Sequence, residues 1–469
     1  MTPIVTASSF STGPPVGRRR GLRAGYATDG ATGRTGSGAT NPCSEAPVRT
    51  IGQHRDDLAA LLAPVVAGLG AEELPLDELV GAGEGAGAGA GFAHRVLAAS
   101  VQSPVPLPPF DNSQMDGFAV RVAEVGQQVR VVAPIPAGVV PEPLEPGTAA
   151  PIMTGARIPI GADAVFPVEA TEPGAFPAAL ELPRVTVPAD LTAGTFVRGT
   201  GSDLPTGAEL APAGSAVTPA LLGALASAGV TTVSVRRALR VLVVSTGSEL
   251  QGADADAATI GDANGIALRA ALAQVGADSR AVRVPDHVAA FDQALDAAVG
   301  DWADLVLTTG GISAGAYEVV RQALEPRGLA VTPVAMQPGG PQAFGSVVFG
   351  AGGGVDALAG RAVPVVSFPG NPVSALVSFE VFLRPLLAAA VGLTADRPTQ
   401  VLPAASAAGS PAGKHQVRRG RVQDGAVHFV GGPSSHLLVH YAAATHLVHV
   451  PVGVDTVEVG DPLTVWSLR

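Results

Sequence analysis

The chain of 469 residues is poor in cysteine, in lysine and in charge of either sign. Cys43 is the only cysteine, which excludes an intramolecular disulfide and a metal site built from several cysteines. A single cysteine fits the reducing cytosol, so we expect a cytoplasmic protein. Lys414 is the only lysine, so the cationic side chains are almost all arginine. Charged residues make up 15% of the chain and the net charge is −11, which argues against nucleic acid as a partner.

Long uninterrupted apolar runs are also missing. The uncharged stretch 211–235 is broken by prolines and glycines, so it predicts a short helix near 220–228 and a strand rather than a membrane span. Arg18, Arg19 and Arg20 are followed by no apolar stretch, so we expect neither a secretory signal nor a membrane contact. With 47% hydrophobic residues, the chain can form a sizeable core spread over about three domains.

The stretch Asp304–Leu324 contains the pattern around which the chain is organised. An apolar run at 305–307 predicts a buried strand, and glycines follow it at Gly310, Gly311 and Gly315. A helical pattern then begins, with Glu318 expected in its first turn. Strand, glycine loop and helix together present backbone N–H groups to an anion. A tight turn without a ligand explains the loop alone equally well.

The first half of the chain predicts three kinds of structure. Residues 1–50 are rich in Gly, Ser, Thr and Pro, which predicts a disordered extension. Apolar residues recur at helical spacing from Ile51 to Val66, and a Gly/Ala loop follows near 81–91. Short β-type runs between 120 and 196 predict a small all-β domain.

Two polar residues of this half are candidates for a site. Asp116 lies on a loop behind a proline-rich entry, as part of an Asx-rich turn or as a carboxylate held for a metal or a proton. Thr154 comes at a strand end before Gly155, and it offers a ligand a hydroxyl and an N–H, unless it serves the turn alone.

Four strand-then-helix units span roughly 237–390 and predict a doubly wound α/β domain, whose ligands bind at the carboxyl ends of the strands. Five polar residues follow such strands: Glu249, Asp286, Ser313, Glu318 and Asn371. Three carboxylates beside a Gly-Gly loop favour an anionic substrate that binds together with a cation. From Thr399 alternating residues predict a β-barrel or sandwich, with a hairpin turn at Asp424-Gly425 and a middle loop at Ser434–His436.

Eight segments occur in a characteristic order along the chain: PPFDNSQMDGFAV, IMTGARIP with GADAV, RGTGSD, VSTGSEL, DANG, TTGGISAG, MQPGGP and FPGNPVSA. Together they resemble the MoeA/gephyrin E-domain family of molybdopterin molybdenumtransferases over residues 51–469. The resemblance implies a four-part, elongated homodimer. It implies a linker domain from 51–104 and 197–236, an inserted β domain at 105–196, a molybdopterin-binding α/β domain at 237–392 and a C-terminal β domain at 393–469.

The activity that the resemblance implies is insertion of molybdate into adenylylated molybdopterin, with release of AMP. On the matching motifs, the catalytic residues are Asp116, Glu249, Asp286 and Glu318, where the family often has Asp in place of Glu318. The substrate-binding residues are Thr154, Gly310, Gly311, Ser313, Gly315, Pro369, Asn371, Pro372 and Ser435. Carboxylates repel such a substrate unless a hard cation lies between them, so we expect Mg²⁺ on Glu249 and Asp286.

One departure leaves other functions open. Many members carry three lysines where this chain has Pro333, Gln337 and Gly340, and Gly340 is expected to need positive φ. Loss of these charges weakens oxyanion binding unless arginines replace them. The alternatives are a catalytically weakened, scaffold-type paralogue and a molybdopterin adenylyltransferase, although the added β domains argue against the second.

Overall fold

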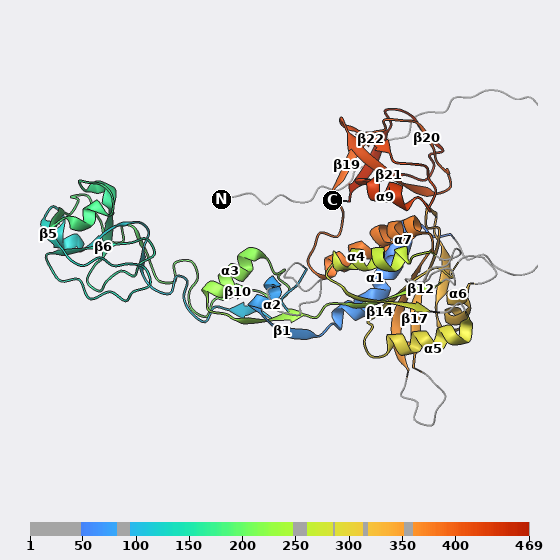
Figure 1. The fold of residues 1–469 in the computed structure, drawn as a ribbon, viewed down its shortest axis with the longest axis horizontal. Coiled ribbons are helices and arrows are strands. Elements are labelled where there is room, and N and C mark those ends of the chain that lie inside the picture. Colours follow the sequence, from blue (N-terminus) through green and yellow to red (C-terminus); the bar gives the residue numbers. More distant parts are fainter. Residues whose placement is uncertain are drawn as a thin grey trace, which may run out of the picture. The chain divides into compact units, whose positions relative to one another are not determined.

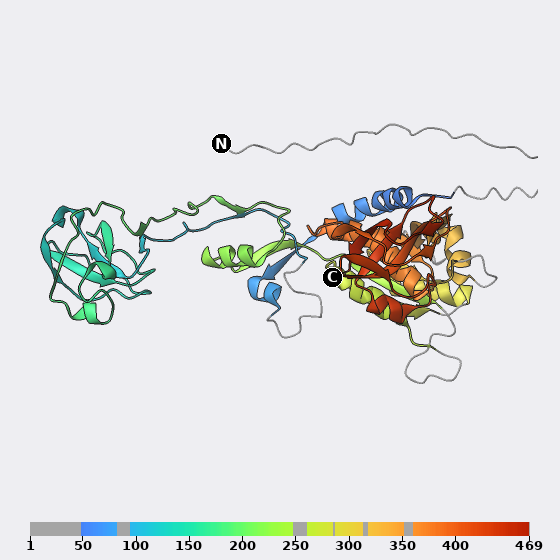
Figure 2. The same ribbon diagram turned by 90° about the horizontal axis from the view of Figure 1, so that it is seen from above.

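The computed structural model describes residues 48–81, 94–246, 260–284, 287–312, 318–350 and 360–468, shown as coloured ribbon in Figures 1 and 2. Its elements form an α/β domain, a smaller β domain, a linker region and a C-terminal β domain, which agrees with the predicted fold class. The division at particular residues stays a prediction.

The α/β domain is built on a six-stranded sheet of order β13 (Asp278–Val284), β12 (Arg240–Thr246), β14 (Leu305–Thr309), β18 (Arg361–Phe368), β17 (Pro341–Phe349) and β15 (Ala330–Pro333). The first four strands are parallel, as predicted. The last two were not predicted: β17 runs antiparallel to both β18 and β15, so the sheet is mixed.

Both faces of this sheet are buried, which explains the continuous apolar runs of its strands. Val241 and Val243 of β12 pack in one cluster with α4 (Ala263–Ala273) and α7 (Pro372–Ser378). Leu242 and Val244 face the other cluster, with α5 (Val288–Val299) and α6 (Val319–Leu324). Helices therefore cover both faces, and the strand ends remain for a ligand. Glu318, expected in the first turn of α6, instead precedes that helix.

Helix α1 (Ile51–Ala67) begins at a capping box between Thr50 and Gln53. Its buried Leu58 and Leu62 belong to the same core cluster as β12 and β14. The predicted division assigns this helix to the linker domain, whereas its apolar face packs in the α/β core.

His54 of α1 is fully buried, and neither ring nitrogen has a hydrogen-bond partner in the described part of the chain. Phe344 and Phe382 meet its ring edge-on, with centroids 5.2 and 4.6 Å away. Burial, reinforced by the charge of Arg49, lowers the pKa of His54 to about 4 from its usual 6.5. The ring is therefore neutral in the folded protein at all but acid pH.

We expect His54→Phe to reduce the loss of stability in acid. Between pH 6.5 and about 4 the unfolded wild-type imidazole binds a proton that the folded one refuses. This contribution is therefore complete above pH 6.5 and is lost as the pH falls, by about 1.4 kcal/mol per pH unit. In urea titrations the variant should lose about 2 kcal/mol less than wild type between pH 7 and 5. His428→Phe, at an exposed site, serves as control, and equal losses in both variants would contradict the prediction.

A long helical stretch, Pro372–Ala390, follows β18. It contains α7, a π-helical turn (Phe379–Leu383) and α8 (Arg384–Ala390). Its length and mean hydropathy of 1.6 would suit a membrane span, but 72% of the apolar window is buried inside the protein. Among the described residues it is the single stretch that meets this test. Most of it is buried in the core of the α/β domain.

The β domain contains a five-stranded sheet of order β7 (Ala164–Pro167), β4 (Gly117–Val120), β6 (Thr148–Ile152), β5 (Gln128–Val131) and β8 (Arg184–Thr186). Four of these strands, β5, β6, β7 and β8, lie in the region 120–196, where the sequence predicted short strands. Beside it, β3 (Asn112–Ser113) pairs with β9 (Val197–Arg198).

The linker region contains β1 (Ala71–Pro75) paired with β11 (Thr232–Arg236), and β2 (Val101–Gln102) paired with β10 (Glu209–Ala211). Its helices are α2 (Leu76–Val80) and α3 (Pro219–Ser227), and α3 confirms the short helix predicted in the uncharged stretch. Segments far apart in the sequence therefore form this region together.

The C-terminal domain has strands in the order β16 (Met336–Gln337), β21 (His415–Gln423), β23 (His446–Val450), β25 (Pro462–Ser467) and β19 (Thr399–Pro403). β22 (Ala426–Phe429) pairs with β21, while β20 (Ala408–Gly409) pairs with β24 (Thr456–Val457). Asp424 and Gly425 have φ of 50° and 74°, the conformation of a tight hairpin turn, so the predicted hairpin is confirmed. β16 comes from the α/β part of the sequence, and α9 (Leu438–Ala443) follows the middle loop.

Candidate active site

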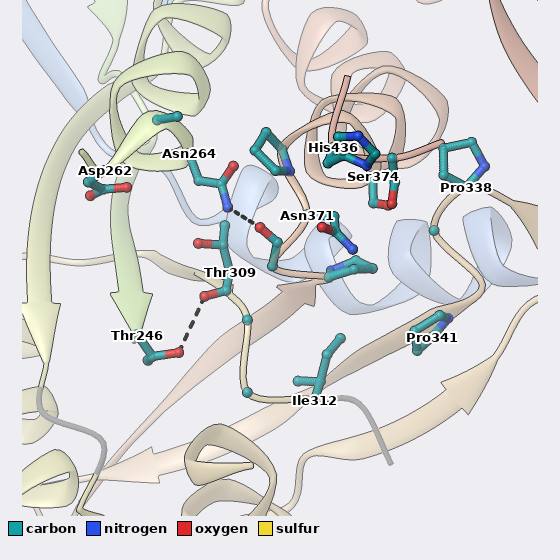
Figure 3. Close-up of a pocket in the computed structure, with 18 of the residues that line it drawn as sticks. Thr246, Asp262, Asn264, Thr309, Ile312, Pro338, Pro341, Asn371, Ser374 and His436 are labelled. Carbon is teal, nitrogen blue, oxygen red and sulfur yellow. Dashed lines mark hydrogen bonds between the residues drawn. The ribbon is translucent and has the colours of Figure 1, made fainter. Parts of the chain in front are cut away.

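A pocket of about 1110 Å³ lies at the carboxyl ends of the parallel strands (Figure 3). Thr246 ends β12, Thr309 ends β14 and Pro369 follows β18, and all three line the pocket. The sequence predicted a ligand crevice at this edge, and the structure confirms it. Seven predicted site residues line it: Gly310, Gly311, Glu318, Pro369, Asn371, Pro372 and Ser435.

The two loop glycines adopt conformations that other residues disfavour. Gly310 has φ +87° and Gly311 has φ +67°. A Cβ on Gly310 would lie 3.2 Å from Thr246 Oγ1, and one on Gly311 would lie 2.8 Å from Val320 Cγ2. The Gly310 N–H donates to the Phe368 carbonyl at 3.0 Å, which ties the loop to β18. Glycine suits both positions for this reason, and the loop that contains them lines the pocket.

Two helices begin at the pocket. Asp262 caps α4 by accepting the Gly265 N–H at 2.8 Å, and Asn264 donates from Nδ2 to the Gly370 carbonyl at 2.8 Å (Figure 3). α7 begins at Pro372, the position where proline's missing N–H costs nothing. Helix N-termini carry partial positive charge, so both helix starts favour an anionic ligand. Both residues belong to the DANG segment of the sequence, whose spacing alone did not place them at the pocket.

The C-terminal domain supplies one wall through the loop that contains Ser434, Ser435 and His436. The Val373 N–H donates to the Ser435 carbonyl at 3.1 Å, so this loop is attached to the first turn of α7. Ser434 Oγ and His436 Nδ1 lie 2.9 Å apart. Ser435, expected to bind substrate, therefore lies beside the start of α7, and its role stays a prediction.

Two buried arginines hold this wall in place. Arg419, 2% exposed, donates to the carbonyls of Val430, Gly432 and Ser434, and Arg418 donates to the Gly431 carbonyl at 3.2 Å. Neither forms an ion pair with a carboxylate in the described ranges, and burial lowers the pKa of both. Sequence reasoning missed them because nothing in an alternating strand pattern shows which loop an arginine contacts.

The three positions where lysines were expected do not line the same pocket. Gln337 lines the pocket, and its Oε1 accepts from Gln416 Nε2 at 2.6 Å. Pro333 and Gly340 line an adjoining hollow of about 460 Å³ together with Lys414. The expected positive φ at Gly340 is wrong, since that strained conformation belongs to its neighbour Gly339 at φ +94°.

Asp116 and Thr154 form a pair of their own in the β domain. The Thr154 N–H and hydroxyl both donate to Asp116 Oδ1, at 2.7 and 2.9 Å. Both residues are exposed, and neither lines the pocket of the α/β domain. Glu249, Asp286, Ser313 and Gly315 lie outside the described residues.

Two carboxylates of the described residues line the pocket, those of Asp262 and Glu318. No group of three or more His, Cys, Asp or Glu side chains in the described ranges is arranged to hold a metal ion by itself. A metal there would therefore need further ligands from the substrate or from the strand-end loops that are not described.

Comparisons with known proteins agree with this arrangement. The family model of the MoeA N-terminal region (domain I and II) matches residues 84–229, and that of a probable molybdopterin-binding domain matches 242–389. Molybdopterin molybdenumtransferase 2 of Mycobacterium tuberculosis is 42% identical over 394 residues, which cover 80% of this chain and 92% of the relative. The molybdopterin molybdenumtransferase of Synechococcus elongatus is 32% identical over 390 residues, with the same coverage.

A solved structure shows the same fold. The molybdopterin biosynthesis MoeA protein of Pyrococcus horikoshii superposes with a TM-score of 0.67 at 24% identity, over 90% of this chain and 100% of that one. The resemblance drawn from the motifs is thus confirmed along most of the sequence. The chain belongs to the MoeA family of molybdopterin molybdenumtransferases, enzymes of molybdenum cofactor biosynthesis.

Proposed function

We propose that this protein inserts molybdate into adenylylated molybdopterin in the cytoplasm, in a Mg²⁺-dependent reaction that releases AMP. The observation that carries this proposal is the Gly310-Gly311 loop at the end of β14, flanked by the starts of α4 and α7 in one pocket of about 1110 Å³. A phosphate anhydride and an oxyanion both need such backbone N–H groups and helix N-termini.

Two acidic residues that follow neighbouring strands in the sequence are suitable ligands for Mg²⁺. Glu249 follows Thr246 by three residues, and Asp286 follows Val284 by two. Thr246 and Val284 are paired in register at the ends of β12 and β13, so the segments that follow both strands start from the same edge of the sheet. We propose that Glu249 and Asp286 hold the ion, with Glu318 nearby. Mg²⁺ favours one or two carboxylates plus substrate phosphates, and it would offset the charge that builds up on the anhydride.

The experiment is AMP release from adenylylated molybdopterin with molybdate and Mg²⁺. We expect AMP to appear with both ions present and to cease when EDTA removes the metal. Net transfer of AMP onto molybdopterin from Mg-ATP would instead indicate an adenylyltransferase. Binding of the substrate without turnover would indicate a scaffold-type paralogue.

We also propose a homodimer whose cleft combines the α/β domain of one chain with the 105–196 domain of the other. The exposed pair of Asp116 and Thr154 supports it. Both are predicted site residues, but they do not line the pocket of the α/β domain, so a second chain would be needed to bring them to it. Sedimentation should show a dimer at assay concentrations. A fully active monomer would contradict this arrangement.

Gln337→Lys should raise molybdate affinity. A cation at this pocket position attracts the dianion by about 1 kcal/mol at low salt, or roughly fivefold in Kd. The gain should shrink at physiological ionic strength, where exposed charges are screened over about 8 Å. Gln337→Met is the matched control, because it also breaks the hydrogen bond from Gln416 but adds no charge. Equal affinity of the two variants in molybdate titrations at low salt would show that Gln337 lies away from the oxyanion.

A further inference from the structure

A second pocket, of about 660 Å³, lies at the opposite end of the same strands. Arg240 begins β12 and lines it, whereas Thr246 at the other end of β12 lines the first pocket. Likewise Ala273 at the end of α4 lines the second pocket, and Asp262 before α4 lines the first. A strand of seven residues spans about 23 Å, so a small ligand in one pocket does not reach the other.

The second pocket is rich in arginine. Four arginines line it, Arg95, Arg237, Arg240 and Arg269, against the two carboxylates of Glu72 and Asp278. Two of the arginines are already neutralised. Arg95 Nη1 lies 2.7 Å from Glu72 Oε1, and Arg237 pairs with both oxygens of Asp304 at 2.8 and 3.0 Å.

Arg240 and Arg269 are different, since neither side chain has an ion pair or a hydrogen bond within the described ranges of the chain. The Arg240 backbone N–H donates to Asp304 Oδ2 at 2.9 Å, which fixes the start of its strand. Two guanidinium groups are thus left to face one pocket in a protein whose net charge is −11. The planar, permanently charged guanidinium forms paired hydrogen bonds with phosphate and carboxylate oxygens.

The wall beside these charges is apolar. Ile266, Ala270 and Ala273 of α4 line it, and Ile266 is 75% exposed. A pocket of 660 Å³ is within the range of roughly 300–1,000 Å³ found for small-molecule sites. We propose that this pocket binds a small organic phosphate, with its phosphate on Arg240 and Arg269 and its apolar or planar part against α4. Binding here requires nothing of the first pocket and does not depend on the proposed function.

AMP is the probe ligand. Inorganic phosphate is the comparison ligand, because it has the charged group without the nucleoside. Titration calorimetry should show two classes of AMP site in the wild-type chain, one at each pocket. Hydrogen–deuterium exchange locates them: the first class should protect the loop at 308–312, and the second class should protect residues 236–242 and 270–280. Phosphate alone should bind the second pocket more weakly than AMP does, because it lacks a group for the apolar wall.

Arg240→Gln and Arg269→Gln should each weaken the second class at least about tenfold, and more at 50 mM than at 300 mM salt. Arg269 is exposed on α4, so its replacement tests the site even if Arg240→Gln fails to fold. Arg130→Gln, which removes an exposed charge in the β domain, is the control and should change neither class. The proposal would be overturned if AMP left residues 236–242 and 270–280 unprotected, or if binding there were unchanged by Arg269→Gln.

Discussion

Asp286→Ala is expected to lower AMP release at least about a hundredfold, the loss typical of removing a group that stabilises developing charge. Asp286 follows β13, whose last residue Val284 is paired with Thr246 at the pocket. Without its carboxylate, the proposed Mg²⁺ would lose one of two protein ligands, and the anionic groups would lose part of their neutralisation. Turnover in saturating Mg²⁺, compared with wild type, measures the effect.

The fold should survive this change, because a residue just beyond a strand end supports little of the core. The melting temperature of Asp286→Ala is therefore expected to match that of wild type. Asp301→Ala is the control, since Asp301 is an exposed carboxylate of the same domain and lies away from the pocket. Unchanged turnover in Asp286→Ala would remove Asp286 from the site.

Gly311→Ala is expected to reduce turnover at least about tenfold through displacement of the glycine loop, since small misplacements at a site have large kinetic effects. The new Cβ would lie 2.8 Å from Val320 Cγ2 and 3.0 Å from Val320 N. Val320 belongs to α6 and is fully buried in the core, so it cannot move aside easily. A φ of +67° adds backbone strain of roughly 1–3 kcal/mol.

Gly261→Ala is the matched control for this loop. Gly261 also lines the pocket, but its φ is not strained and a Cβ there would meet nothing within 4 Å. Turnover and thermal melting should be measured for both variants. A loss in Gly311→Ala but not in Gly261→Ala would show that the effect is specific to position 311 and does not follow from replacing any pocket glycine. Equal activity of Gly311→Ala and wild type would mean that the loop position is not critical for the reaction.

Local patterns in the sequence predicted the parts of the molecule that depend on neighbours along the chain. Apolar runs predicted β12 and β14, because a strand buried on both faces needs continuous apolar side chains. Asp424-Gly425 predicted a hairpin, because few residues accept positive φ. The motifs also predicted the family.

The same patterns failed where packing decides the outcome. The periodicity of α1 does not show that Leu58 and Leu62 pack beside β12 rather than in the linker region. β17 pairs with β18 in an antiparallel direction, and its partly exposed residues form no clear apolar run. The pattern around Glu318 predicted the helix but placed Glu318 in its first turn, whereas α6 begins one residue later at Val319.

The sequence by itself determined the family, the parallel strands of the α/β domain and the glycine loop at their carboxyl ends, since turn chemistry and apolar periodicity act over a few residues. Only the tertiary structure decided which distant groups meet. It brought Arg419 to the loop of Ser434, Gln416 to Gln337, and Arg240 and Arg269 to one pocket. These contacts join residues 15 or more positions apart, and they follow from how buried surfaces fit together, which no local spacing encodes.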